Sequence, residues 1–160
     1  MHLAQLNVGR LLAPIDDPRI AEFVANLEPV NALAEASPGY LWRLQDDSGD
    51  ATHIRVSDDE LMIINLTLWT SVETLADFVF RTGHVEYLRR RRQWFEGAVE
   101  ATTCLYWIPA GTLPDPVDAI ARLEHLRADG PTPRAFTFRH RFSPGGELGP
   151  VSADRDVCPA

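Results

Sequence analysis

The sequence predicts an α+β fold built on an antiparallel sheet, and three observations lead to this class. Residues 3–9 and 60–71 have the alternation and composition of strands. Residues 16–37 and 72–96 space their apolar side chains as helices do. The order of all the elements is β-α-β-β-α-β with an appended α-β, which places helices against one face of the sheet.

The first predicted helix, over 16–37, has capping residues at its start and a proline in its middle. Asp16 or Asp17 is expected as the N-cap, with Pro18 at the first helical position. Pro29 lies inside the helical pattern and lacks the N–H that the helix ladder needs. We therefore expect the helix to be kinked or divided there.

The second and third strands are expected to pair as a hairpin. Residues 39–47 (GYLWRLQDD) begin with a glycine that follows Pro38, and 60–71 (ELMIINLTLWTS) is the most strand-like segment of the chain. The loop over 46–53 (DDSGDATH) resembles a calcium-binding loop in composition only, because the order of ligands and the bidentate glutamate are missing. The hairpin is thus predicted to have an acidic tip without a metal.

The C-terminal part of the chain supplies a strand, a helix and another strand. A strand is expected over 102–111, a helix over 115–129 with an aspartate N-cap, and a last strand over 135–142 (AFTFRHRF). Residues 1–143 are predicted to form a single domain, and 144–160 a loose C-terminal tail.

Together these elements predict a ferredoxin-like antiparallel sheet with helices on one face and the other face open. Proteins with this layout often cover the open face by pairing two sheets into a dimeric α+β barrel. A homodimer is therefore expected.

Composition excludes several classes of protein. The net charge of −8 argues against a nucleic-acid binder, which needs a basic surface to release counterions from phosphates. Apolar runs are far shorter than the roughly 20 residues that span a bilayer, so we expect a cytoplasmic protein with no membrane partner. Metal-ligand spacings and phosphate-binding loops do not occur, so no bound metal or nucleotide is expected.

Strand alternation predicts a row of polar side chains on the open face of the sheet. If Ala4 faces the helices, Asn7 points the other way, and the corresponding row of the third strand holds Asn65, Thr67 and Trp69. Aromatic candidates from the neighbouring strands are Tyr40, Trp42, Tyr106 and Trp107. An apolar cavity with a few convergent polar groups is typical of a small-molecule site. A solvated face or a dimer interface accepts the same residues, so these alternatives stay open.

The second helical region is predicted to break at Thr82 and Gly83. The apolar residues before this pair are out of phase by half a turn with those after it. A break there places His84 in the first turn of a new helix. The helix dipole disfavours a cation at that position, so His84 should be neutral and available as a base, hydrogen-bond acceptor or ligand.

Four consecutive arginines follow on the same predicted helix. Helical geometry spreads them widely around the axis, with Arg89 and Arg90 facing solvent and Arg91 and Arg92 flanking the inward line of His84. An inward arginine can bind a ligand anion, but it can equally hold a protein carboxylate or stack on an aromatic ring. An inward histidine can likewise be an ordinary hydrogen-bonded core residue.

Several stretches of the chain resemble one family. They are HLAQLNVGRL, LWTSVETLADFVFRTGHVEYLRRRRQWFE and LYWIPAGTLPDPVDAIARLEHLRADGPTPRAFTF. Over about residues 2–142 they resemble the bacterial domain of unknown function 3291, which is similar to the dimeric α+β barrel superfamily. That superfamily includes cofactor-independent monooxygenases, haem-binding enzymes, isomerase-like enzymes and proteins without known activity. The resemblance implies that the recurring residues of the family correspond here to Trp69, His84, Arg91, Arg92, Trp94, Phe95 and Trp107.

The first candidate function is an enzyme that acts on an apolar or aromatic small molecule without a bound metal, as a monooxygenase or as an isomerase or cyclase. His84 would be its general base or hydrogen-bond donor, and Arg91 or Arg92 would stabilise an enolate or a carboxylate. Asn7 and Asn65 would orient a carbonyl group. The aromatic walls would be Trp69 and Trp94.

Two other functions are consistent with the same residues. A haem-binding protein would use His84 or His140 as the proximal ligand and an arginine to pair a propionate. A non-catalytic binding or structural dimer would be favoured if the inward face proved fully packed.

Overall fold

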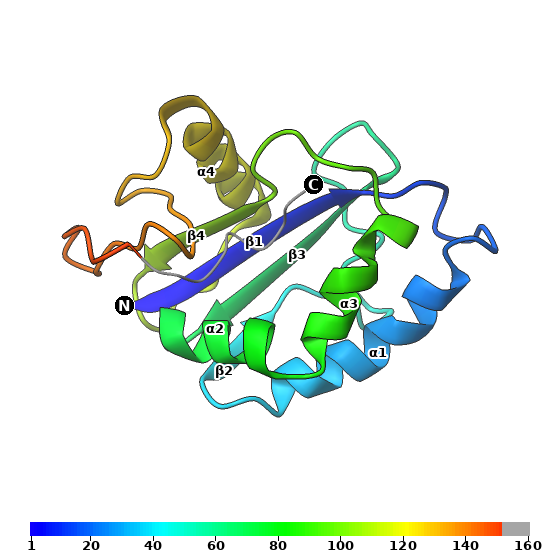
Figure 1. Ribbon diagram of the computed structural model, residues 1–160, viewed down its shortest axis with the longest axis horizontal. Helices are drawn as coiled ribbons and strands as arrows, with labels where there is room; N and C mark the ends of the chain where they lie inside the picture. The colour runs from blue at the N-terminus through cyan, green and yellow to red at the C-terminus, as the bar shows by residue number, and fades with distance from the viewer. Residues whose placement is uncertain (152–160) are drawn as a thin grey trace.

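The computed structural model describes residues 1–151, which form a four-stranded antiparallel sheet with helices packed against it (Figure 1). In chain order the elements are β1 (His2–Arg10), α1 (Ala21–Glu35), β2 (Tyr40–Arg43), β3 (Met62–Trp69), α2 (Val72–Arg81), α3 (His84–Arg90), the short 3₁₀ helix η1 (Arg91–Gln93), β4 (Thr103–Ile108) and α4 (Pro116–Asp129). The α+β class and the antiparallel sheet predicted from the sequence are confirmed.

The sheet has the strand order β2-β3-β1-β4, with every neighbouring pair antiparallel. In the central strand β1, Asn7 lies opposite Asn65 of β3 and opposite Thr103 of β4. Gln5, two residues earlier, lies opposite Thr67. Because side chains alternate along a strand, these residues share one face of the sheet, here called the odd face.

The two faces of the sheet are covered by different helices. On the even face, Leu6 and Leu66 belong to a core cluster with Leu123 and Leu126 of α4 and with apolar residues of 44–56. The odd face packs against α1, α2 and α3. Figure 1 shows the strands running between α4 and these three helices.

The polar row was predicted to lie on an open face of the sheet. It lies instead on a face that helices cover. α2 and α3 follow β3 directly and cover the odd face, whereas the appended α4 covers the even face. Pairing of two sheets into a homodimeric barrel stays a prediction. Leu6 and Leu66 of the even face are already fully buried within one chain, in the cluster that includes α4.

The first helix differs from the prediction in two respects. It begins at Ala21, after a turn in which Asp17 accepts hydrogen bonds from the backbone and side chain of Arg19. Pro29 lies inside an unbroken helix. Pro29 and Ala25, whose carbonyl loses its helical partner, are both exposed, so water can satisfy that carbonyl.

The predicted break between the next two helices is confirmed at Thr82 and Gly83. The Thr82 hydroxyl donates a hydrogen bond to the Phe78 carbonyl at 2.6 Å, at the end of α2. The same hydroxyl accepts the backbone N–H of His84 at 3.2 Å, at the start of α3. One side chain thus joins the two helix ends and fixes where His84 begins.

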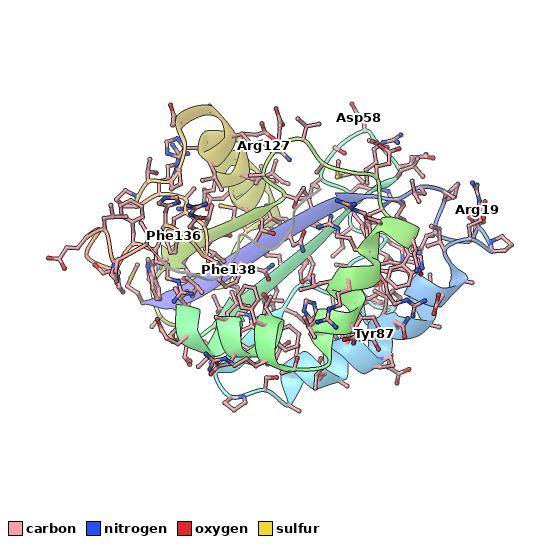
Figure 2. All side chains as sticks on the ribbon, in the orientation of Figure 1. Arg19, Asp58, Tyr87, Arg127, Phe136 and Phe138 are labelled. Carbon is pink, nitrogen blue, oxygen red and sulfur yellow. The ribbon has the colours of Figure 1, made fainter. Side chains whose placement is uncertain are left out.

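The predicted last strand over 135–142 reduces to a single pair of backbone hydrogen bonds between Phe136 and Leu105 of β4. Phe136 lies beside β4 (Figure 2). The backbone N–H groups of Thr137 and His140 then bond within a turn, which ends the pairing. The chain folds back so that Gly149 donates to the Arg141 carbonyl. The rest of the predicted tail, 152–160, lies outside the described residues.

None of the helices within residues 1–151 combines the length and apolar character that a membrane crossing requires.

Candidate functional site

A cavity of about 170 Å³ lies between the odd face of the sheet and helices α1 and α3. A smaller compartment of about 40 Å³ adjoins it. The two compartments share seven lining residues, which are Asn7, Val30, Asn31, Arg43, Asn65, His84 and Leu88. Cavities of about 150 Å³ can hold benzene, so the larger compartment has room for an aromatic ring.

The floor of the cavity is the polar row of the odd face. The registered pair Asn7 and Asn65 lines both compartments, as expected from strand alternation. In the smaller compartment, Thr67 Oγ1 donates to Gln5 Oε1 at 2.8 Å and accepts from Trp69 Nε1 at 2.9 Å. This buried chain of hydrogen bonds fixes the Gln5 amide and ends the polar row.

The roof of the larger compartment is helix α1. Phe23, Leu27 and Val30 give it an apolar surface, and Asn31 gives it an amide. Ala34 is the only buried residue of this helix. Val30 and Leu33 are partly buried against the core of the odd face, and the remaining inward side chains of α1 line the cavity.

The far wall comes from α3 and the segment after it. Tyr87 lies where α3 meets α1 (Figure 2), and Trp94 and Phe95 follow η1. The backbone N–H of Leu12 donates to the Trp94 carbonyl at 2.9 Å, and Phe95 forms a bridge with Leu11. These bonds attach the aromatic wall to the end of β1.

His84 lines both compartments and is placed by the Thr82 cap at the start of α3. Its ring packs on Phe78 with centroids 4.8 Å apart. Burial lowers the pKa of His84 below its ordinary value of 6.5, and the Val79 carbonyl opposes this shift only in part. The Nδ1 atom is buried with no hydrogen-bond partner among the described residues. The ring is thus held neutral with one nitrogen uncommitted.

Of the four arginines, Arg89 and Arg91 lie as the sequence predicted, whereas Arg92 does not. Arg90, expected to face solvent, has its guanidinium 5.2 Å from the centre of the Trp94 ring. Arg89 is exposed and pairs with Glu86, whereas Arg91 lines the cavity with its guanidinium over the Phe95 ring. Arg90, partly exposed, pairs with Glu22 of α1. Arg92 was expected to face inward but is exposed and lies outside the residues that line the cavity. The chain tightens into the 3₁₀ helix at Arg91, which rotates each residue further than an α-helix does.

Of the three tryptophans predicted as site residues, only Trp94 lines the cavity. Trp94 is almost fully buried and lines the larger compartment. Trp69 is fully buried under Phe78 and reaches the polar row only through its bond to Thr67. Trp107 donates its indole N–H to the Phe142 carbonyl. Neither Trp69 nor Trp107 lines either compartment.

Gly9 and Arg43 are two of the lining residues that were not predicted as part of the site. Gly9 lies beneath Phe95, and a glycine inside a strand is the signal that could have indicated such a close approach. Arg43 of β2 lines both compartments, and its guanidinium donates to Glu35 Oε1 at 2.8 Å and to the Gly49 carbonyl at 2.7 Å. It therefore ties the sheet to the end of α1 and to the hairpin loop.

Among residues 1–151, no group of three or more His, Cys, Asp or Glu side chains is arranged to hold a metal ion. Asp50 of the hairpin loop lines the larger compartment, but its Oδ1 accepts from the backbone and hydroxyl of Thr52. The polar side chains that line the larger compartment are thus amides, one imidazole, two guanidinium groups, the hydroxyls of Thr52 and Tyr87, and the Asp50 carboxylate.

A family model described as "Domain of unknown function (DUF3291)" matches residues 2–150 of the chain. The chain belongs to this family. No curated protein matches the sequence.

Two solved structures are similar to this DUF3291 chain. One is SnoaB, a cofactor-independent oxygenase from Streptomyces nogalater, at 16% identity and a TM-score of 0.49. The other is an asparagine-to-alanine mutant of the same oxygenase, at 14% identity and a TM-score of 0.48. Each match covers 71% of this chain and 98% of the other.

Proposed function

We propose that this DUF3291 chain is an enzyme that removes a proton from an apolar or aromatic small molecule without a bound metal. The single observation that carries the proposal is the state of His84. This side chain lines the cavity, has a pKa lowered by burial, and leaves Nδ1 without a protein partner. A neutral, uncommitted imidazole next to a ligand is what general base catalysis requires.

The rest of the cavity supports the same chemistry. His84 would accept a proton from an acidic C–H group, and the electron pair of the broken bond would move to the oxygen of the adjacent carbonyl. The amides of Asn7 and Asn65 can donate hydrogen bonds to that developing enolate oxygen. Phe23, with the aromatic wall that follows η1, provides an apolar surface for a ring. The enolate can then react with dioxygen, or rearrange, which are the monooxygenase and the isomerase or cyclase outcomes.

A screen of enolisable aromatic ketones and electron-rich phenols tests the proposal. Oxygen uptake and mass spectrometry of the products would separate oxygenation from rearrangement. A substrate turned over by the wild type should be lost with His84→Ala. His125→Ala is the matched control, because His125 lies on α4 and bonds to Asp129 and Thr132, away from the cavity. Equal turnover by wild type and His84→Ala would contradict the proposed base.

Haem binding is a second candidate, favoured by the unpartnered Nδ1 of His84. His140 does not line either compartment, so His84 would be the proximal ligand and Arg91 would pair a propionate. After incubation with haem and removal of the unbound haem by gel filtration, the wild-type protein should retain a Soret band that His84→Ala lacks. Wild-type protein that is colourless after gel filtration would exclude this candidate.

A non-catalytic structural dimer is not favoured, because the inward face is not fully packed, whereas a non-catalytic binding dimer is compatible with the cavity. A cavity of about 170 Å³ with polar groups on its floor is unfavourable in a purely structural element. A homodimer remains compatible with the proposed enzyme, and sedimentation velocity would measure it.

A further inference from the structure

Arg91 differs from Arg89 and Arg90 in having no carboxylate partner among the described residues. Arg89 and Arg90 form ion pairs with Glu86 and Glu22, at 2.7 Å and 2.6 Å. The Arg91 guanidinium instead lies 5.4 Å from the centre of the Phe95 ring, and it has no ion pair with any carboxylate among the described residues. A partly buried guanidinium that lines a cavity thus keeps its donors uncommitted.

The position of Arg91 along the cavity separates it from His84. The guanidinium lies near the end of β1, where a β-carbon built on Gly9 would be 3.6 Å from Arg91 Nη2. Asn7 is two residues earlier on the same face, which corresponds to about 7 Å along the strand. His84 and Asn7 line both compartments, whereas Arg91 lines only the larger one. Arg91 is therefore at one end of the cavity, away from the centre where the proposed base lies.

The other charged groups of the cavity are already occupied by protein partners. Arg43 donates to Glu35 and to the Gly49 carbonyl. Asp50 accepts from Thr52 through Oδ1. A ligand anion would therefore find at Arg91, beside the ring of Phe95, a lining guanidinium that has no carboxylate partner among the described residues.

We infer that the ligand of this cavity is an aromatic or apolar carboxylate, with its acid group held by Arg91 and its body extending toward Asn7 and His84. A guanidinium presents two parallel N–H donors that match a carboxylate, and nearby apolar surface strengthens such a pair. Recognition of the acid group by Arg91 and proton removal beside His84 and Asn7 would thus use different groups of lining residues, because Arg91 lines only the larger compartment. The inference rests on the proposed function only in placing the ligand in this cavity.

A matched pair of probes tests this inference without any turnover. 2-Naphthoate and 2-naphthamide have the same ring system and nearly the same shape, but only the first carries a charge. Calorimetry should show that wild-type protein binds 2-naphthoate about tenfold more tightly than 2-naphthamide. Arg91→Gln should abolish this preference by weakening only the acid, and Arg91→Lys should keep part of it.

Arg89→Gln is the matched control, because it removes the same charge from a side chain that is 69% exposed and lies outside the cavity lining. It should keep the preference for 2-naphthoate. The inference is overturned if wild-type protein binds neither probe or binds both equally, or if Arg91→Gln retains the preference. A carboxylate preference without any His84-dependent turnover would instead overturn the proposed function and leave this inference standing.

Discussion

Gly9 lies directly beneath the aromatic ring of Phe95: a β-carbon at position 9 would be 2.6 Å from Phe95 Cδ1 and 2.7 Å from Cε1. Real β-carbons do not approach other heavy atoms this closely, so any other residue at this position must displace the ring. The Arg91 guanidinium lies over the face of the Phe95 ring. The absence of a side chain at Gly9 therefore allows the ring and the guanidinium to occupy their positions at the end of the cavity.

Gly9→Ala should therefore destabilise the protein and weaken ligand binding. Overpacking of this kind typically costs about 1–3 kcal/mol, because the ring and the segment after η1 must move. Urea unfolding measures the loss of stability. Titration with an aromatic ligand, followed by quenching of tryptophan fluorescence, measures the effect on the cavity.

Gly83→Ala provides the matched control for this substitution. Gly83 has a helical backbone with φ near −58°, and the nearest heavy atom to a β-carbon there would be Leu33 Cδ2, at 3.9 Å. Alanine at a compatible glycine position typically stabilises a protein by about 0.4–1 kcal/mol, through the unfolded chain. If both variants lost the same stability, the close approach of Gly9 and Phe95 would not be the cause.

The hydrogen-bond chain from Trp69 through Thr67 to Gln5 should contribute measurably to stability. Thr67→Val removes the hydroxyl and leaves the buried indole N–H and the Gln5 carbonyl without their partner. A loss of about 1–3 kcal/mol is expected in denaturant unfolding.

Thr103→Val tests the same idea in the opposite sense. Thr103 lies on the neighbouring strand β4, and its buried hydroxyl has no hydrogen-bond partner among residues 1–151. Replacing it with valine should leave stability unchanged or raise it. A large loss of stability with Thr103→Val and none with Thr67→Val would contradict the finding that the Thr67 hydroxyl is hydrogen-bonded and the Thr103 hydroxyl is not.

The lowered pKa of His84 predicts a pH dependence of stability. Burial is its main cause, so the folded state binds a proton less readily than the unfolded state, whose histidine titrates near 6.5. As the pH falls through 6.5, the unfolded state takes up its proton first, and the free energy of unfolding decreases. The stability that depends on a neutral His84 is fully present above pH 6.5. It is lost as the pH falls from 6.5 toward the lower pKa of His84 in the folded state.

His84→Gln should lack this part of the pH dependence. The measurement is the change in unfolding free energy between about pH 7.5 and about pH 5.5, compared for wild type and variant. Wild type should lose more stability than His84→Gln over this interval. An equal loss in both proteins would mean that the pKa of His84 is unchanged on folding.

Those features of the fold that depend on local pattern could be predicted from the sequence. The half-turn shift in the apolar pattern located the break at Thr82 and Gly83, and strand alternation placed Asn7 and Asn65 on one face. The same pattern did not show which helices would cover that face. Alternation separates two faces but does not identify which of them the helices cover.

The errors in the predicted site come from local changes of geometry that the pattern does not encode. Arg92 was placed by α-helical rotation, but the chain becomes a 3₁₀ helix at Arg91. Trp69 lies on the predicted face, yet Phe78 covers it, so it supports the site only through Thr67. Strand alternation gave the face of Trp69 but not which residues would pack over it.

The central claim is that His84 is the base of a small-molecule site, and proton exchange tests it most directly. An enolisable aromatic ketone that binds the cavity is incubated in D₂O, and NMR follows deuterium incorporation at its acidic carbon. Wild-type protein and His125→Gln should catalyse incorporation, whereas His84→Gln should be slower by about 10²–10⁴-fold while still binding the ketone. Incorporation by His84→Gln at the wild-type rate would contradict the claim.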